Sequence, residues 1–365
     1  MRWKAWKPVY PSFTAREDFE RGFDIVFRRV IVPELDELEQ ERRSIYAKSR
    51  LSAWGGLTAG LAIFAVCFLP FLGEKLNTVI LTFIFGFLFA IIVIALGYWL
   101  SHWLGNPFRK RLKPLFVEAA CAFFPDLSYQ ASAEGAYDLE RLRRIKSSRW
   151  FEVPATQGMV TSAFEDLFQG RHRDTDFKIF EAPLEQKVGA SLSSLCLEMP
   201  APVPVSGSVV IERSASRFAL IRTPSVRENT VPGDPIGTFN EHFRIQCEDP
   251  TDEARLLTAS FCTALLEIAA LNESLVHDDW RTRLLFTIAD GTLLILFPVT
   301  TDHSLGYYEF GSVKRSVYDM EDDIHAFLHQ VIIPYRIIEC FYQTGIIQSS
   351  DEASDRLSIA TLRHE

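Results

Sequence analysis

Two long runs of uncharged, mostly apolar residues constrain this chain more than any other feature. Residues 53–72 and 76–100 contain no Asp, Glu, Lys or Arg, and only Gly73, Glu74 and Lys75 separate them. Each run reaches the roughly 20 residues that an α-helix needs to cross the hydrocarbon core of a bilayer. A cleaved signal peptide fits poorly, because the first run starts late and is then repeated. The pattern therefore predicts a transmembrane hairpin, with spans at about 53–72 and 77–100.

Lysine and arginine residues flank this hairpin on both outer sides. They are Arg42, Arg43, Lys48 and Arg50 before the first run, and Arg109, Lys110, Arg111 and Lys113 after the second. The connecting turn carries only Lys75. Under the positive-inside rule, both termini are predicted to be cytoplasmic, in a multi-pass protein of the cell inner membrane. The basic flanks are also expected to attract anionic lipid.

Small residues recur at four-residue spacing in both runs. Gly56 and Gly60 form a GxxxG pattern, and Gly86 and Ala90 stand at the same spacing in the second run. This spacing lets helix backbones approach closely. It predicts that the two spans pack against each other, with self-association of two chains as the alternative.

The segment before the hairpin, residues 1–50, is predicted to be helical and cytoplasmic. Thr14 and Glu17 have the spacing of a capping box, which predicts a helix over residues 15–32. Pro33 is expected to kink or restart this helix. Residues 34–50 are strongly charged and read as a solvated helix that continues into the first span.

Residues 105–347 are predicted to form a soluble α+β domain, possibly of two lobes, with helices packed on a mainly antiparallel sheet. The expected helices cover residues 113–126, 137–146, 250–271 and 320–342. The expected strands lie within 177–198 and at 209–211, 218–221, 243–247, 284–288 and 293–297. Asp249-Pro250 should start one helix, and Asp290-Gly291 should form a hairpin turn. Residues 348–365 read as a flexible polar tail.

Several of these stretches, taken in order, resemble one bacterial family. They are the charged helix before the membrane, the double span, FQGRHRDTDFKIFEAPLE, FRIQCEDPTDEARLLTASF, ADGTLLILFP and YYEFGS. The chain resembles the domain-of-unknown-function family numbered thirty-one thirty-seven over most of its length. The resemblance implies a membrane-anchored soluble domain whose activity is not established, and it carries no catalytic residue over.

Composition and missing motifs narrow the possible functions. The formal net charge of −9 lacks the basic character of a nucleic-acid-binding protein. The six cysteines are scattered and form no CxxC pair, so no metal site is expected from them. Signatures for phosphate loops, dinucleotide sites, serine hydrolases and zinc proteases are absent from the sequence. No cofactor is predicted, and no catalytic residue is assigned.

The most chemically dense stretch is the candidate ligand site. It comprises Arg171, His172, Arg173, Asp174 and Asp176. Arginines and a histidine beside acids can bind an anionic ligand, whereas a solvated loop with internal ion pairs explains the same residues.

Three weaker candidates lie elsewhere in the sequence. His325 and His329 stand four residues apart on a predicted helix, a spacing that suits a metal but lacks a third ligand. Residues 277–279, and the carboxylates Glu181 and Glu309, are the other two.

We therefore expect a membrane-tethered cytoplasmic binding or scaffold module without enzymatic activity, acting with an unknown protein partner or by self-association. The alternative is an enzyme or ligand sensor for a membrane-proximal anionic substrate near residues 171–176. A channel or transporter fits poorly, because neither run carries Asp, Glu, Lys, Arg or His to line a pathway.

Overall fold

The computed structural model describes residues 12–68, 76–104, 106–132, 151–152, 165–186, 191–213, 234–275, 284–298 and 314–347. These residues belong to two compact units. The first unit contains Met1–Phe123 and Glu309–Leu328, and the second contains Phe124–Tyr308 and His329–Glu365. The bounds of the segments predicted from the sequence stay a prediction.

The first unit is helical. A 3-10 turn at Asp18–Glu20 precedes α1 (Phe23–Val26), a π-helix (Phe27–Ile31) and a second 3-10 turn (Val32–Glu34). Then follow α2 (Leu35–Phe68), α3 (Leu76–Trp103), α4 (Asn106–Phe123), a 3-10 turn at Val317–Asp319, and most of α9 (Glu321–Val331). Its core is rich in phenylalanine, with Phe23, Phe27 and Phe108 at most 1% exposed.

The helix predicted over residues 15–32 begins later than expected. Gly22 has a φ of 89°, in the left-handed region that glycine adopts without steric cost, and regular helix starts only at Phe23. Thr14 does not cap a helix, because it lies before the first 3-10 turn, for which Glu17 is the N-cap residue. Its backbone N–H donates to Glu321 Oε1 at 3.0 Å. Pro33 lies in the 3-10 turn from which α2 restarts at Leu35.

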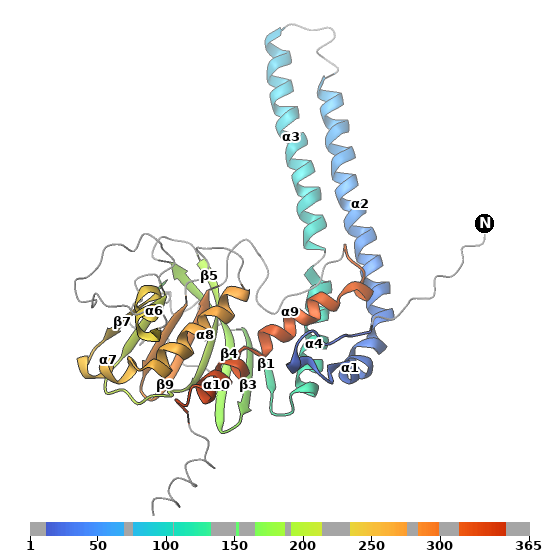
Figure 1. Cartoon of the computed structure of the whole chain (residues 1–365). Coiled ribbons are helices and arrows are strands. Elements are labelled where there is room, and N and C mark those ends of the chain that lie inside the picture. Colours follow the sequence, from blue (N-terminus) through green and yellow to red (C-terminus); the bar gives the residue numbers. More distant parts are fainter. Residues whose placement is uncertain are drawn as a thin grey trace, which may run out of the picture. The chain divides into compact units, whose positions relative to one another are not determined.

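Helices α2 and α3 pack side by side in opposite directions (Figure 1). Near one end the Ser52 hydroxyl donates to the Gly97 carbonyl oxygen at 3.3 Å, and farther along the rings of Phe64 and Phe87 are 6.1 Å apart. A Cβ on Gly97 would lie 2.7 Å from the Cα of Gly56, too close for any side chain. The predicted packing of the two apolar helices on each other is confirmed, and Gly56 lies directly against Gly97.

The length and apolar character of the helices can be compared with what a membrane span needs. Within the described ranges, no single helix is both long and apolar enough to span a bilayer, and the apolar stretch Gly86–Leu100 falls short. Pro250–Leu256 together with Ala259–Leu271 passes by length and composition, but the two helices are bent by 77° at their junction. The transmembrane character of the α2–α3 hairpin therefore stays a prediction.

The second unit is built on an antiparallel sheet, in the order β1-β3-β4-β5-β9-β8-β6-β7, with β2 also pairing with β4. The strands are β1 (Ser128–Ser132), β2 (Phe151–Glu152), β3 (Glu165–His172), β4 (Thr175–Gln186), β5 (Ser191–Pro200), β6 (Val209–Arg213), β7 (Phe243–Cys247), β8 (Leu285–Ala289) and β9 (Thr292–Pro298). Every described pair is antiparallel. The predicted mixture of helices with a mainly antiparallel sheet is confirmed.

The helices of the second unit are α6 (Pro235–His242), α7 (Pro250–Leu256), α8 (Ala259–Leu275) and α10 (Ile333–Gln343). The Asp249 side chain accepts the N–H of Thr251 at 2.9 Å, which confirms the predicted helix start. Asp290 and Gly291 adopt φ angles of 51° and 70° in the β8–β9 turn, which confirms the predicted hairpin.

Two helices predicted as continuous are broken. The stretch 250–271 divides into α7 and α8, because Leu257 leaves the helical region with a ψ of 57°. The stretch 320–342 divides at Ile332, and Pro334 opens α10, where a missing backbone N–H costs no hydrogen bond. The helix predicted at 137–146 and the strand predicted at 218–221 lie outside the described residues.

Candidate functional site

The predicted ligand-binding residues lie at the turn between β3 and β4. Arg171 and His172 end β3, Asp176 belongs to β4, and Arg173 turns the chain with a φ of 51°. The Arg171 guanidinium lies 3.8 Å from both Asp174 and Asp176, at the long end of the range for an ion pair. The structure brings all five predicted residues together in one exposed hairpin turn.

Glu339 of α10 is the residue that sequence reasoning missed at this turn. Its carboxylate lies 2.6 Å from His172 Nε2 and accepts two hydrogen bonds from Arg173, at 2.9 and 2.8 Å. The Arg173 guanidinium also lies 4.5 Å from the centre of the Tyr342 ring. Burial alone would raise the pKa of Glu339, but the hydrogen bonds from His172 and Arg173 lower it below its ordinary value.

These contacts give the turn a structural role, because Glu339 already neutralises Arg173 and orients His172. No local signal could have identified Glu339, which is 166 residues from Arg173 and meets it only in the folded unit. The proposal that the turn binds an anionic ligand stays a prediction.

The His325 side chain is paired with the carboxylate of Glu20. Its Nδ1 lies 2.6 Å from Glu20 Oε1, both side chains are buried, and the Phe13 ring stacks on the imidazole at 4.6 Å. Among the described residues, no group of three or more His, Cys, Asp or Glu side chains is placed to hold a metal ion. Residues 277–279 and 309 lie outside the described ranges. Glu181 is buried in β4, opposite Leu195.

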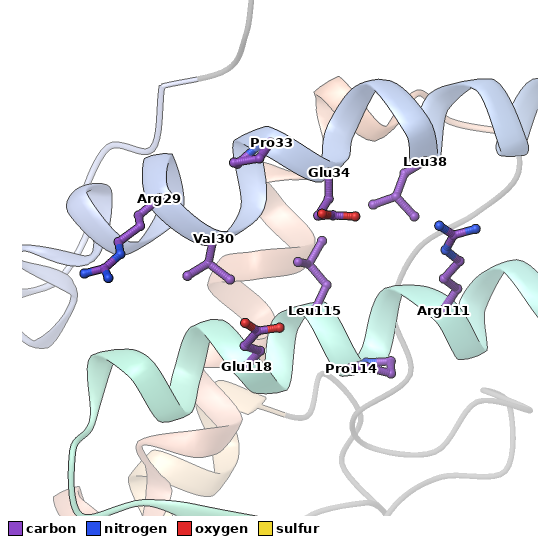
Figure 2. Close-up of a pocket in the computed structure, with 9 residues that line it drawn as sticks. All are labelled: Arg29, Val30, Pro33, Glu34, Leu38, Arg111, Pro114, Leu115 and Glu118. Atoms are coloured by element: carbon purple, nitrogen blue, oxygen red, sulfur yellow. The ribbon is translucent and has the colours of Figure 1, made fainter.

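A groove in the first unit offers a more open site. It runs between α4 and the helical path that leads into α2, and its volume is about 520 Å³ (Figure 2). The residues that line it are Arg29, Val30, Pro33, Glu34, Leu38, Arg111, Pro114, Leu115 and Glu118. Leu38 and Leu115 are buried at its floor, whereas the four charged side chains are exposed. A volume of this size suits a small organic ligand.

The charged residues of the groove differ in their partners. Arg111 is engaged, with ion pairs to Glu37 and, at 2.5 Å, to Glu41, and the hydrogen bond to Glu37 raises its pKa above the ordinary value. The side chains of Arg29, Glu34 and Glu118 make no hydrogen bond or ion pair within the described part of the chain. Figure 2 shows Glu34 and Glu118 reaching into the groove from opposite walls, with Arg29 and Arg111 at its two ends.

Sequence reasoning missed this groove. Its two walls come from segments more than seventy residues apart, and no motif marks either of them. No protein-family model, no curated protein and no solved structure matches this chain. The family resemblance noted from the sequence therefore stays a prediction. The groove and the α2–α3 hairpin are the features that bear on function.

Proposed function

We propose that this protein is a membrane-tethered binding module of the cell inner membrane, with both termini in the cytoplasm. The α2–α3 hairpin would anchor it in the bilayer. The groove of the first unit and the sheet of the second would act on the cytoplasmic side, without catalysis. The observation that carries the proposal is the outward-facing apolar surface of the hairpin.

All but one of the exposed large apolar side chains among the described residues lie on α2 and α3; Ile25 is the exception. On the hairpin they are Leu51, Trp54, Leu61, Val66, Ile84, Phe87, Leu88, Phe89, Ile91, Ile92, Leu96, Tyr98, Trp99, Leu100 and Trp103. Soluble monomers rarely expose so extended an apolar surface, so it marks contact with lipid or with a partner.

Lipid is favoured over a protein partner for three reasons. The exposed apolar residues occur on both helices, and the runs 53–72 and 76–100 contain no charged residue. Trp54, Trp99 and Trp103 lie near the ends of these runs. Indole rings prefer the headgroup region of a bilayer, which the ends of a membrane span would reach. The flanking lysines and arginines favour a cytoplasmic location for both ends of the hairpin and would bind anionic lipid.

Matched arginine substitutions test this anchor. Ile92 on α3 is 59% exposed and Ile25 on α1 is 64% exposed, so both side chains can be enlarged without disturbing a core. An arginine at the centre of a span costs about 2.5–3.5 kcal/mol of insertion free energy, and two add further cost. The double variant Leu88→Arg/Ile92→Arg should lose membrane association in alkaline carbonate extraction, whereas Ile25→Arg should stay in the membrane pellet.

The same assay can refute the anchor. If carbonate releases the unaltered protein, or if the Leu88→Arg/Ile92→Arg variant is retained as fully as Ile25→Arg, the hairpin does not cross the bilayer. The apolar surface would then have to be covered by protein.

A further inference from the structure

The groove beside α4 combines three features that specify a ligand. Its floor is apolar, formed by buried Leu38 and Leu115 with half-buried Val30 beside them. Its volume of about 520 Å³ leaves room for one small molecule rather than a folded partner. Glu34 and Glu118 enter it from facing walls, and Arg29 stands at one end (Figure 2).

The charges that remain available in the groove define the complementary ligand. Arg111 already pairs with two carboxylates, Glu37 and Glu41, and offers no uncompensated positive charge to a ligand. Arg29, Glu34 and Glu118 have no side-chain partner among the described residues, so one positive and two negative charges are open to a ligand. A complementary molecule carries one anionic group, two cationic groups and an apolar stem that can cover Leu115.

We propose that the groove binds a basic amino acid, with a net charge of +1. Its α-carboxylate pairs with Arg29, and its α-ammonium and side-chain cation pair with Glu34 and Glu118. Its methylene stem packs against Val30 and Leu115. This assignment deepens the proposed binding role, but it does not depend on insertion of the hairpin into a membrane.

A small amino acid fits these charges better than a basic side chain of a protein partner does. A lysine or arginine within a polypeptide has neither a free α-carboxylate nor a free α-ammonium, so it would leave Arg29 and one carboxylate without a counter-charge. The free amino acid satisfies all three groups at once. The contribution of its α-carboxylate is therefore the decisive quantity.

Isothermal titration calorimetry on the full chain in detergent measures this quantity directly. L-arginine and L-lysine are the probes. Agmatine is L-arginine without the carboxylate, and norleucine has the apolar stem of L-lysine without the side-chain cation. Loss of one charge-assisted hydrogen bond weakens binding by about tenfold or more. Agmatine and norleucine should each bind about tenfold more weakly than the matching amino acid.

Substitutions assign the contacts. Glu34→Gln and Glu118→Gln should each weaken L-arginine binding by about tenfold, because each removes one charged acceptor. In Arg29→Gln, L-arginine and agmatine should bind equally, since the carboxylate has lost its partner. Glu241→Gln, at an exposed position of α6 in the other unit, is the control and should bind as the unaltered chain does. Melting curves establish that each variant is folded.

Three results would overturn the proposal. The first is the absence of heat from both basic amino acids at millimolar concentration. The second is equal affinity for L-arginine and agmatine in the unaltered chain. The third is unchanged affinity in folded Glu34→Gln and Glu118→Gln variants. Because the titration is done in detergent, none of these results bears on membrane insertion, which carbonate extraction tests separately.

Discussion

The α2–α3 hairpin and the sheet are both rich in large apolar residues. The sheet buries these side chains, whereas the hairpin exposes many of them. In the sheet, Phe286 of β8 and Phe297 of β9 are at most 1% exposed. In the hairpin, Phe89 and Ile92 of α3 are 55% and 59% exposed. The sheet buries its large apolar side chains within its own unit, whereas the hairpin leaves many of its large apolar side chains exposed on its surface. Apolar content alone therefore does not distinguish a buried core from an exposed apolar surface; the direction of the side chains does.

The change from one environment to the other occurs within a single helix. In its first half, α2 carries the buried Glu39, which accepts hydrogen bonds from Arg42, from Arg43 and from the backbone N–H of Val317. From Leu51 onward, α2 has four exposed large apolar side chains, namely Leu51, Trp54, Leu61 and Val66. The first half of α2 is thus held by polar contacts in a protein interior, and the second half by close helix packing on α3.

The largest difference is expected from the same substitution made in both regions. Phe286→Ala removes a fully buried ring and should lower the free energy of unfolding by about 3–5 kcal/mol. Phe89→Ala removes an exposed ring and should change it by less than about 1 kcal/mol in detergent. Urea unfolding of the full chain, followed by circular dichroism, gives both values. Equal losses would show that the two regions do not differ in burial.

The next largest effect is a loss of stability at low pH, caused by protonation of Glu39 in the first half of α2. Burial would raise the pKa of Glu39, but the hydrogen bonds from Arg42, Arg43 and Val317 outweigh it and lower the pKa from 4.5 to about 2. A carboxyl with a lowered folded pKa stabilises the fold fully above pH 4.5, and this contribution is lost as the pH falls through 2. The contribution is at most about 3 kcal/mol.

Glu39→Gln should remove most of this pH dependence. Unfolding of both proteins between pH 2 and pH 6 is the measurement, and the stability of the variant should fall less between pH 4.5 and pH 2. Glu241→Gln serves as the exposed control. If the unaltered protein and Glu39→Gln lose stability in parallel over this interval, the carboxylate is not held by these hydrogen bonds.

A smaller effect is expected where α2 and α3 touch. A Cβ on Gly97 would lie 2.7 Å from the Gly56 backbone, whereas a Cβ on Gly55 meets nothing within 4 Å. Gly97→Val should therefore destabilise the hairpin by about 1–3 kcal/mol through overpacking, and Gly55→Val should be nearly neutral. Thermal unfolding in detergent compares the two. A neutral Gly97→Val would mean that the helices do not pack along this line.

The smallest effect is expected at the β3–β4 turn. Arg173→Gln removes the paired hydrogen bonds to Glu339, but the Arg173 side chain is 46% exposed and solvent screens the pair. The loss should be about 1 kcal/mol or less, measured in the same urea titration. A loss comparable to that of Phe286→Ala would show the turn to be a buried structural element.

Local signals predicted the elements that local chemistry determines. Asp290-Gly291 makes its turn because both residues tolerate a positive φ, and Asp249 caps α7 through its own side chain. The uncharged runs 53–72 and 76–100 likewise predicted the paired helices α2 and α3.

Contacts between distant segments were not predictable. Glu339 meets Arg173 across 166 residues, and Glu20 meets His325 across 305. The groove likewise forms only when α4 packs beside residues 29–38. The five residues predicted at 171–176 do cluster, but the carboxylate that pairs with His172 and Arg173 comes from a helix that no local pattern connects to the turn.

Whether the hairpin crosses the membrane can be measured by the accessibility of single cysteines placed in its connecting turn and outside it. All six native cysteines are replaced by alanine, and a single cysteine is introduced at Glu74→Cys or at Asp126→Cys. A membrane-impermeant maleimide is then added to intact spheroplasts and to permeabilised ones. If both termini are cytoplasmic, Glu74→Cys should be labelled in intact spheroplasts, and Asp126→Cys only after permeabilisation. If both cysteines are labelled only after permeabilisation, residues 74 and 126 lie on the same side and the hairpin does not cross the bilayer.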